Sequence, residues 1–287
     1  MSPSLDASAY HTLLQSFLTE DLGSGDITTD TVVSATRHGR GELIAKAPLV
    51  LAGIDLFIEV FRLLDPATEA EICCHDSAEL KPGQIPARVS ASARALLTGE
   101  RVAVNLLQRL SGVATLTQRF VRAVAGTNAE ILDTRKTTPG LRALEKYAVR
   151  VGGGRNHRKD LGEAVLIKEN HIRLAGGVSA ALEAAQAAKG RAKWIEIEVT
   201  NQEELRGALA HNPDVVLLDN MSPALVRQAV DKVRAHDPAR KIRTEASGGI
   251  TLENVREFAE AGVDWISVGA LTHSAPAVDL SFEIEPA

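Results

Sequence analysis

Short apolar runs alternate with helical patterns from about residue 128 onward, and this alternation restricts the fold more than any other feature of the chain. Six runs are typical of buried strands: 129–133, 164–167, 194–199, 215–218, 243–246 and 264–268. Helical patterns follow at 178–188, 202–210, 223–235 and 252–261. Two of these helices begin with cap signals, Thr200 with Glu203 and Ser222 before Pro223. Repeated strand–helix units predict a parallel sheet, either a barrel or an open doubly wound sheet.

The residues that follow the predicted strands favour the barrel. An open dinucleotide-binding sheet carries G-x-G-x-x-G after its first strand, and neither this motif nor a G-x-x-x-x-G-K-[ST] loop occurs here. Polar residues or glycines instead follow nearly every strand: Arg135 with Lys136, Lys168, Glu198, Asp219, Ser247 with Gly248 and Gly249, and Gly269. Because the carboxyl ends of barrel strands meet on one face, we expect an active site there.

The first third of the chain has a different, mixed pattern. A helix is predicted within the first 25 or so residues, an apolar helix at 54–64, and strands at 41–47, 69–75 and 85–90. A long amphipathic helix is predicted from 93 to about 125, with a break at Gly112. We therefore expect an α+β domain over 1–112, with the tail 274–287 as a candidate addition to it, and an α/β barrel over 113–273.

Composition excludes several classes of protein. The chain is 45% hydrophobic, which fits a folded core. It has no apolar run of about 18 residues, and its first ten residues lack a basic and an apolar region, so we expect neither a transmembrane helix nor a secretory signal. Cys73 and Cys74 are adjacent and ill-placed for an ordinary disulfide, so a reduced, cytoplasmic setting is expected. Only 3% of residues are aromatic and the net charge is −5, which argues against nucleic-acid binding. We expect neither a membrane nor a nucleic acid as partner.

The net charge hides an uneven distribution. Residues 135–173 contain ten Lys or Arg against four Asp or Glu, a net charge of +6, so the remaining chain carries −11. Glycines 152–154 interrupt this basic segment, which is therefore not one exposed helix. Several loops that deliver cations to one place suit an anionic ligand. The cationic rim is predicted to consist of Arg135, Lys136, Arg158 and Lys168.

Carboxylates and glycines complete the predicted site. Glu198 and Asp219 end consecutive strands, and such a pair beside phosphates holds Mg²⁺, stabilises a cationic transition state or forms ion pairs with the rim lysines. Glu196 alternates with Glu198 and is a lesser candidate.

The glycine-containing ends of the last two strands, 246–250 and 268–271, predict a phosphate site. His157 and His273 are the best-placed histidines, and we expect hydrogen-bond donors rather than metal ligands there because zinc spacing is absent.

Several strings of residues together resemble one family. The most specific are 133–142 (DTRKTTPGLR), 146–154 (KYAVRVGGG), 156–158 (NHR) and 166–171 (LIKENH). Further matches follow in consistent order at 20–23, 25–28, 99–101, 105–106, 218–220, 247–249 and 268–273. This set closely resembles the quinolinate phosphoribosyltransferases, also called nicotinate-nucleotide pyrophosphorylases (carboxylating). The resemblance spans almost the whole chain.

The resemblance implies an incomplete, TIM-like α/β barrel and a specific reaction. Phosphoribosyl pyrophosphate and quinolinate would give nicotinate mononucleotide, CO₂ and pyrophosphate in NAD biosynthesis, with Mg²⁺ as cofactor. It also implies a homodimer in which Arg101 reaches the neighbouring subunit's site; higher oligomers stay open. Lys136, Lys168, Glu198 and Asp219 would be catalytic. The substrate-binding set would be Arg101, Thr134, Arg135, Lys136, His157, Arg158, Lys168, Glu198, Asp219, Ser247, Gly248, Gly249, Val268, Gly269, Ala270 and His273.

Within that set the implied roles differ. Arg135, Lys136, His157, Arg158 and Lys168 would contact quinolinate. Glu198 and Asp219 would face the ribose and the metal ion. Ser247, Gly248, Gly249 and Gly269 would hold phosphate.

Three alternatives stay open from the residues themselves. An aldolase-like barrel would use Lys168 as a Schiff-base nucleophile. A related phosphoribosyltransferase, such as the molybdenum-transport-associated homologue or a nicotinate-specific enzyme, is the second alternative. Nicotinate has one carboxylate and should need fewer cations than this rim offers. A non-catalytic phosphometabolite-binding protein would not need both Glu198 and Asp219.

Overall fold

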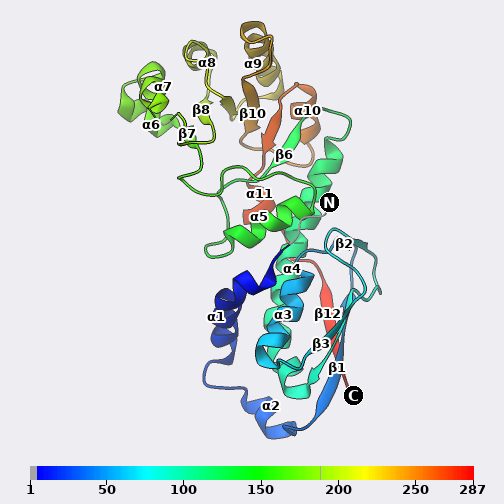
Figure 1. The fold of residues 1–287 in the computed structure, drawn as a ribbon. Helices are drawn as coiled ribbons and strands as arrows, with labels where there is room; N and C mark the ends of the chain where they lie inside the picture. The colour runs from blue at the N-terminus through cyan, green and yellow to red at the C-terminus, as the bar shows by residue number, and fades with distance from the viewer. Residues whose placement is uncertain (1–4, 188) are drawn as a thin grey trace. The chain divides into compact units, whose positions relative to one another are not determined.

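The computed structural model describes residues 5–187 and 189–287, which divide into two compact units (Figure 1). The first unit comprises Met1–Leu116, Arg150–Gly152 and Ala275–Ala287, and the second comprises Thr117–Val149 and Gly153–Ser274. Residues 1–4 and 188 lie outside the described residues, so the very start of the chain and the predicted end of the helix 178–188 are not compared further.

A four-stranded antiparallel sheet forms the centre of the first unit. Its strand order is β12-β1-β5-β3, with β1 at His38–Ala45, β3 at Glu69–Ile72, β5 at Ala87–Ser92 and β12 at Leu280–Pro286. A two-stranded sheet pairs β2 (Leu49–Val50) with β4 (Glu79–Leu80). The three predicted strands fall on β1, β3 and β5. The tail adds β12, which pairs with β1 from Ala45 opposite Leu280 to Gly39 opposite Pro286.

The helices of this unit pack apolar side chains on the sheet. They are the 3-10 helix η1 (Ala7–Tyr10), α1 (His11–Leu22), α2 (Ile27–Val32), α3 (Ile54–Leu64) and α4 (Ala93–Ala123), which continues into the second unit. Phe57 and Phe61 of α3 meet Phe282 of β12 with ring centroids 5.2–5.4 Å apart. Gly41 on β1 leaves room for this cluster, because a Cβ there would lie 2.0 Å from the Phe282 ring. The predicted helix at 54–64 is confirmed.

The predicted break of the long helix at Gly112 is wrong. α4 runs through Gly112 without interruption. The glycine is required by packing instead, because a Cβ at this position would lie 2.1 Å from the carbonyl oxygen of Pro276. No helix built from the described residues has the length and apolar character needed to cross a membrane.

The second unit contains a six-stranded parallel sheet. Its strands are β6 (Glu130–Leu132), β7 (Val165–Ile167), β8 (Ile195–Val199), β9 (Val215–Asp219), β10 (Arg243–Ser247) and β11 (Trp265–Ser267). They follow the order β6-β11-β10-β9-β8-β7, so the first strand pairs with the last, as in a barrel. Within the described residues, β6 and β7 form no ladder with each other. The predicted incomplete α/β barrel is confirmed, and its six predicted strands all occur. We call the unpaired edge the β6–β7 opening.

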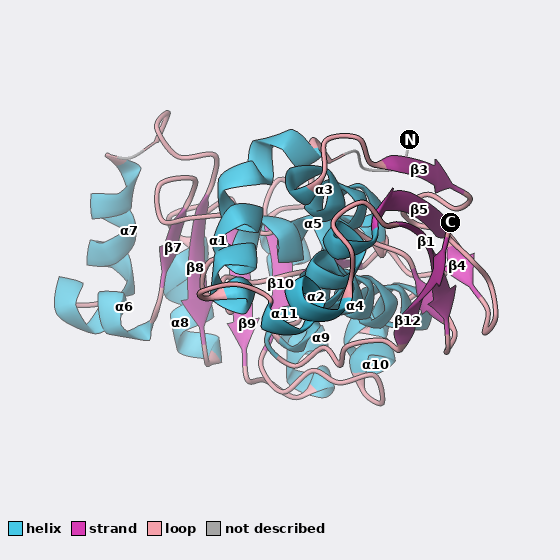
Figure 2. Ribbon diagram, turned by 90° about the horizontal axis from the view of Figure 1, so that it is seen from below, coloured by secondary structure: helices cyan, strands magenta, loops and turns pink. Residues whose placement is uncertain are grey.

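Helices cover the outer face of this sheet. α7 (Val178–Gln186), α8 (Gln202–Leu209), α9 (Pro223–His236) and α10 (Val255–Glu260) each contact a strand of the sheet. Figure 2 shows β7, β8 and β9 side by side, with α7 and α8 beside them. Ser222 caps α9 as predicted, since its hydroxyl accepts from the Leu225 N–H. The cap of α8 is Asn201 rather than the predicted Thr200: its side chain accepts from the N–H groups of two residues in the first turn.

Three helices of this unit were not predicted from the sequence: α5 (Arg142–Val151), α6 (Glu169–Ala175) and α11 (Ala270–His273). α6 and α11 are too short to show a repeating apolar face. α5 is clearly amphipathic, so its periodicity is a signal that the prediction missed, and its buried residues include Glu145 and Lys146. Two buried charged residues on one helix indicate a role beyond packing.

The Gly112 contact yields a stability prediction. We expect Gly112→Ala to destabilise the protein by roughly 1–3 kcal/mol, because the added methyl meets a backbone carbonyl that cannot rotate away. Gly207→Ala on α8 is the matched control: its Cβ would meet only Val178, at 3.4 Å, so a change within about 1 kcal/mol is expected. Thermal unfolding followed by circular dichroism measures both. Equal unfolding midpoints for the two variants would contradict the packing account.

Candidate active site

A cavity of about 610 Å³ lies in the second unit, at the carboxyl ends of the barrel strands. Its lining residues are Asp133, Thr134, Arg135, Lys136, His157, Arg158, Leu166, Lys168, Glu198, Leu217, Asp219, Asn220, Glu245, Ser247, Gly248, Gly249 and Ser267. All four members of the predicted cationic rim are among them. Four carboxylates also line the cavity, so the charge that a ligand meets is more balanced than the +6 of the basic segment.

The loop that follows β6 is fixed to helix α5. The buried Glu145 carboxylate accepts hydrogen bonds from the N–H and the hydroxyl of Thr138, at 3.0 and 2.8 Å. Arg142 Nε donates to the Thr137 hydroxyl at 3.0 Å, and the Lys136 N–H donates to the Thr134 hydroxyl at 3.0 Å. These contacts hold the segment that carries Arg135 and Lys136 in one conformation.

A buried ion pair joins β6 to α5. The Lys146 ammonium, only 3% exposed as a residue, donates to Asp133 Oδ1 and, at 3.0 Å, to the carbonyl oxygen of His157. Burial raises the pKa of Asp133 to about 6, although Lys146 and the His157 N–H act in the opposite direction. Burial likewise lowers the pKa of Lys146, against the charge of Asp133. The pair is costly to bury, and it fixes the neighbouring main chain.

The chain returns to the β6–β7 opening at residues 155–158. Arg155 bridges to Leu132 in parallel, with its N–H donating to Ile131 and its carbonyl accepting from the Asp133 N–H. The His157 N–H then donates to Asp133 Oδ1 at 2.9 Å. This segment lies along the free edge of β6 and brings His157 and Arg158 into the cavity.

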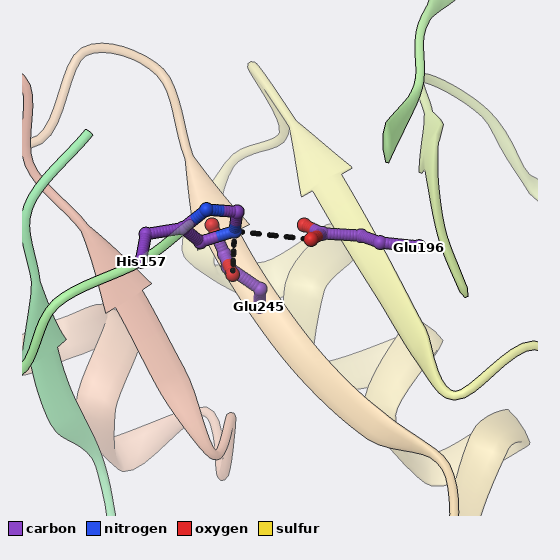
Figure 3. A group of neighbouring side chains, drawn as sticks. All are labelled: His157, Glu196 and Glu245. Atoms are coloured by element: carbon purple, nitrogen blue, oxygen red, sulfur yellow. Dashed lines mark hydrogen bonds and ion pairs between the residues drawn. The ribbon is translucent and has the colours of Figure 1, made fainter. Parts of the chain in front are cut away.

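The His157 ring lies between two carboxylates inside the barrel. Nε2 lies 3.0 Å from Glu196 Oε2 and 3.5 Å from Glu245 Oε2, and Figure 3 shows the two carboxylates approaching that nitrogen from different strands. Trp194 packs edge-on against the ring, and its indole N–H donates to Glu196 at 2.9 Å. All three members of the cluster are buried.

The proton on this ring is held at Nε2. Burial lowers the pKa of His157, but the hydrogen bonds and charges of Glu196 and Glu245 outweigh it and raise the pKa to about 10. The carboxylates thus favour a doubly protonated ring, whereas the Arg158 N–H, 2.8 Å from Nδ1, opposes a proton there. Because two N–H groups cannot face each other at that distance, the geometry favours a proton on Nε2 alone. Burial and the charge of Glu196 raise the pKa of Glu245.

The acidic side of the cavity carries Glu198 and Asp219. Lys168 forms an ion pair with Glu198, a contact that the amine would have to give up to act as a Schiff-base nucleophile. Burial and the charge of Glu198 raise the pKa of Asp219, while Lys168 and Lys136 act in the opposite direction. The two neighbouring carboxylates provide oxygen donors for a divalent cation.

The loop after β10 depends on one glycine. Gly248 has φ +90°, and a Cβ there would lie 2.3 Å from Asn220 Oδ1. The Asn220 N–H donates to the Ser247 carbonyl at 2.9 Å, and its side-chain amide donates to Asp219 at 3.0 Å. The neighbouring Gly249 has φ +62° and no atom within 4 Å of a Cβ, so its backbone faces open space in the cavity.

Five predicted site residues do not line the cavity. Val268, Gly269, Ala270 and His273 lie at α11, where Thr272 donates to the Lys136 carbonyl at 2.8 Å. Gly269 approaches the Lys136 side chain closely, since a Cβ there would lie 3.1 Å from its Cδ. Arg101 is exposed on α4 in the first unit.

Three residues of the site are not among the predicted site residues. Asp133 and Lys146 lie within the strings 133–142 and 146–154 that carry the family resemblance, whereas Glu245 lies outside those strings. Spacing gives one signal for Glu245, since it lies two residues before Ser247 at a strand end, just as Glu196 lies two before Glu198. Burial of a carboxylate inside a barrel cannot be recognised from a single strand.

Two family models match consecutive parts of the chain. The model described as "Quinolinate phosphoribosyl transferase, N-terminal domain" matches residues 26–111. The model described as "Quinolinate phosphoribosyl transferase, C-terminal domain" matches residues 113–283, which include every residue that lines the cavity.

Full-length relatives agree with these matches. A protein of Bacillus subtilis named "Probable nicotinate-nucleotide pyrophosphorylase [carboxylating]" is 43% identical over 95% of this chain and 92% of its own length. The Mycobacterium leprae "Nicotinate-nucleotide pyrophosphorylase [carboxylating]" is 44% identical over 93% of this chain and 94% of its own. The crystal structure of NadC from Streptococcus pyogenes superposes with a TM-score of 0.93 at 37% identity, covering 100% of both chains.

The two glycines after β10 provide a matched test of the loop geometry. Gly249→Ala adds only backbone strain at a positive φ, roughly 1–2 kcal/mol. Gly248→Ala adds a collision with Asn220 to that strain, so it should destabilise by at least about 1 kcal/mol more. Thermal unfolding of both variants gives the difference. If the Gly248→Ala protein were as stable as Gly249→Ala, a methyl group at position 248 would not collide with Asn220, which contradicts this loop geometry.

Proposed function

Because this chain belongs to the quinolinate phosphoribosyltransferase family, we propose that it transfers the phosphoribosyl group of phosphoribosyl pyrophosphate to quinolinate. Carbon dioxide is lost, and nicotinate mononucleotide and pyrophosphate are released, a step of NAD biosynthesis. The observation that supports this best is the convergence of Arg135, Lys136, Arg158 and Lys168, from three separate segments, on one cavity of the barrel. Such a rim suits a small dianion.

The rim binds quinolinate through its two carboxylates. Arginine guanidinium groups bind carboxylates bidentately, and the lysines add point charge. Buried Nε of Arg135 has no hydrogen-bond partner among the described residues, so this guanidinium keeps donor capacity for a ligand. Nicotinate, with one carboxylate, would leave part of this cationic rim without a partner charge, which disfavours it as substrate.

Mg²⁺ fits the acidic side of the cavity. Asp219 and Glu198 offer oxygen donors, the ligands that Mg²⁺ prefers, beside the open backbone of Gly249. Asp219 is the better ligand, because Glu198 is already paired with Lys168. When bound, the ion neutralises charge on the pyrophosphate as it departs.

Two sets of residues in the cavity have different roles in the reaction. The cationic rim holds quinolinate with its ring nitrogen toward the sugar, and the carboxylates of Glu198 and Asp219 stabilise the oxocarbenium-like ribose carbon. The pyridine nitrogen attacks that carbon and becomes cationic. The positive nitrogen stabilises the electron pair left on the neighbouring ring carbon when its carboxylate departs as CO₂, and that carbon then takes up a proton from solvent to give nicotinate mononucleotide. The barrel orients the ring and excludes water.

The assembly that we propose is a homodimer. Arg101, exposed on α4, would enter the site of the neighbouring subunit and add a further cation for the substrates. The support for this is the family membership together with the exposure of Arg101.

The reaction itself tests the proposal. We expect the protein, incubated with quinolinate, phosphoribosyl pyrophosphate and Mg²⁺, to release CO₂ and nicotinate mononucleotide in equal amounts. Nicotinate in place of quinolinate is the control for the nicotinate-specific alternative. Absence of both products with quinolinate refutes the proposal, and a preference for nicotinate assigns the protein to that alternative.

Lys136 provides a test of the cationic rim. Lys136→Ala should raise the Kd for quinolinate about tenfold or more, because an ammonium group facing a dianion is lost. Lys159→Ala removes the same charge from the same basic segment, but Lys159 is exposed and lies 3.9 Å from Asp160, so a change within about twofold is expected. Calorimetric titration measures both. Equal affinities for the two variants would place quinolinate elsewhere.

A further inference from the structure

His157 is engaged by the protein through every polar atom that it has. Its N–H donates to Asp133 Oδ1 at 2.9 Å, and its carbonyl accepts from Lys146 Nζ at 3.0 Å. Nδ1 accepts from the Arg158 N–H at 2.8 Å, and Nε2 donates to Glu196 at 3.0 Å. A substrate could hydrogen-bond to this ring only by displacing one of these partners, although the family resemblance implies a direct contact with quinolinate.

Arg158, in contrast, is hydrogen-bonded through its main-chain N–H and one guanidinium nitrogen, which leaves the other guanidinium nitrogens for a ligand. Its main-chain N–H is fixed by the His157 ring, and its Nη1 donates to the Ala164 carbonyl at 3.0 Å. No other hydrogen bond of its guanidinium is found within the described residues, and Arg158 lines the cavity although it is only 6% exposed. Its remaining N–H groups are therefore available to a ligand, in a position set by its neighbours.

Two buried carboxylates, those of Glu196 and Glu245, complete this arrangement, although burying them lowers the stability of the fold. The carboxylate of Glu245 is buried and has only long or weak polar contacts: Oε2 lies 3.5 Å from His157 Nε2, and the Ser267 side chain is its other polar neighbour. Glu196 Oε1 is without a donor in the part of the chain that the structure describes. Packing alone does not require acidic side chains here, since burying an unsatisfied carboxylate destabilises a protein. Their effect is to retain the proton on Nε2 and hold the ring in one orientation.

We propose that His157 is a positioning residue rather than a ligand of the substrate. Four side chains hold it in place, and we call them the clamp: Asp133, Lys146, Glu196 and Glu245. Held in this way, His157 fixes the main chain of Arg158, whose guanidinium binds the anion. The identity of the anion as quinolinate rests on the proposed function, but the clamp does not. Asp133 and Lys146 bind the backbone N–H and carbonyl of His157, and Glu196 and Glu245 hold its Nε2. Because Nδ1 accepts a hydrogen bond from the Arg158 N–H, the position of the ring sets the position of the Arg158 main chain.

A matched pair of substitutions separates positioning from direct binding. Asparagine places its side-chain oxygen near the former Nδ1, whereas glutamine places its amide near the former Nε2. We expect His157→Asn to bind quinolinate within about threefold of the unaltered protein and His157→Gln to bind at least about tenfold more weakly, since only the former can accept from the Arg158 N–H. The reverse order would assign the ligand contact to Nε2 and overturn the proposal, as would equal affinities.

Removal of one buried charge tests the carboxylates. Glu245→Gln should raise the KM for quinolinate about tenfold while the KM for phosphoribosyl pyrophosphate stays within about twofold, because Arg158 shifts and the phosphate side does not. Glu257→Gln, at an exposed position on α10, controls for the lost charge. A uniform loss of kcat with both KM values unchanged would indicate general structural damage and contradict the positioning role.

Nitrogen-15 NMR of the imidazole ring tests the clamp in the unaltered protein, even if a variant fails to fold. We expect Nε2 to carry the proton and Nδ1 to show the shift of a hydrogen-bond acceptor, both without ligand and at saturating quinolinate. A proton on Nδ1, or a changed protonation pattern when quinolinate binds, refutes the proposal. If quinolinate does not bind at all, the proposed function fails, while the ligand-free spectrum still decides whether the clamp exists.

Discussion

The rest of the site depends on the β6–β7 opening. A closed barrel would satisfy the edge of β6 with a neighbouring strand, but here residues 155–158 run along that edge and bond to it. The buried pair of Asp133 and Lys146 secures the segment, since it bonds to the main chain of His157 from both sides. A fold that leaves one strand edge free thus gains a place where loop residues enter the barrel.

Charge within the cavity is separated rather than uniform. The basic segment supplies four cations to the cavity and the strand ends supply Glu198 and Asp219, and the two groups meet where Lys168 pairs with Glu198. Within the barrel, burial and the nearby Arg135 lower the pKa of Arg158, and the charge of Glu196 acts in the opposite direction. This division matches a reaction in which a dianion must approach a polyphosphate while positive charge develops on the sugar carbon between them.

Much of this architecture follows from local patterns, and the remainder does not. Strand–helix alternation and the polar strand ends predict the barrel, its active face and the four rim cations, because each signal is local and repeated. The break predicted at Gly112 was wrong because a distant carbonyl, that of Pro276, explains the glycine. The roles of Lys146 and Glu245 could not be predicted, since each depends on a partner from another element whose distance no sequence pattern encodes.

The most direct measurement is a crystal structure of the protein with quinolinate and an unreactive analogue of phosphoribosyl pyrophosphate. The account predicts quinolinate in the barrel cavity, with a carboxylate on the Arg158 guanidinium, its ring nitrogen toward Glu198 and Asp219, and the His157 ring still bonded to Glu196 and to the Arg158 N–H. Quinolinate bound outside this cavity, or bound with its cationic partners drawn from other segments, would contradict the account.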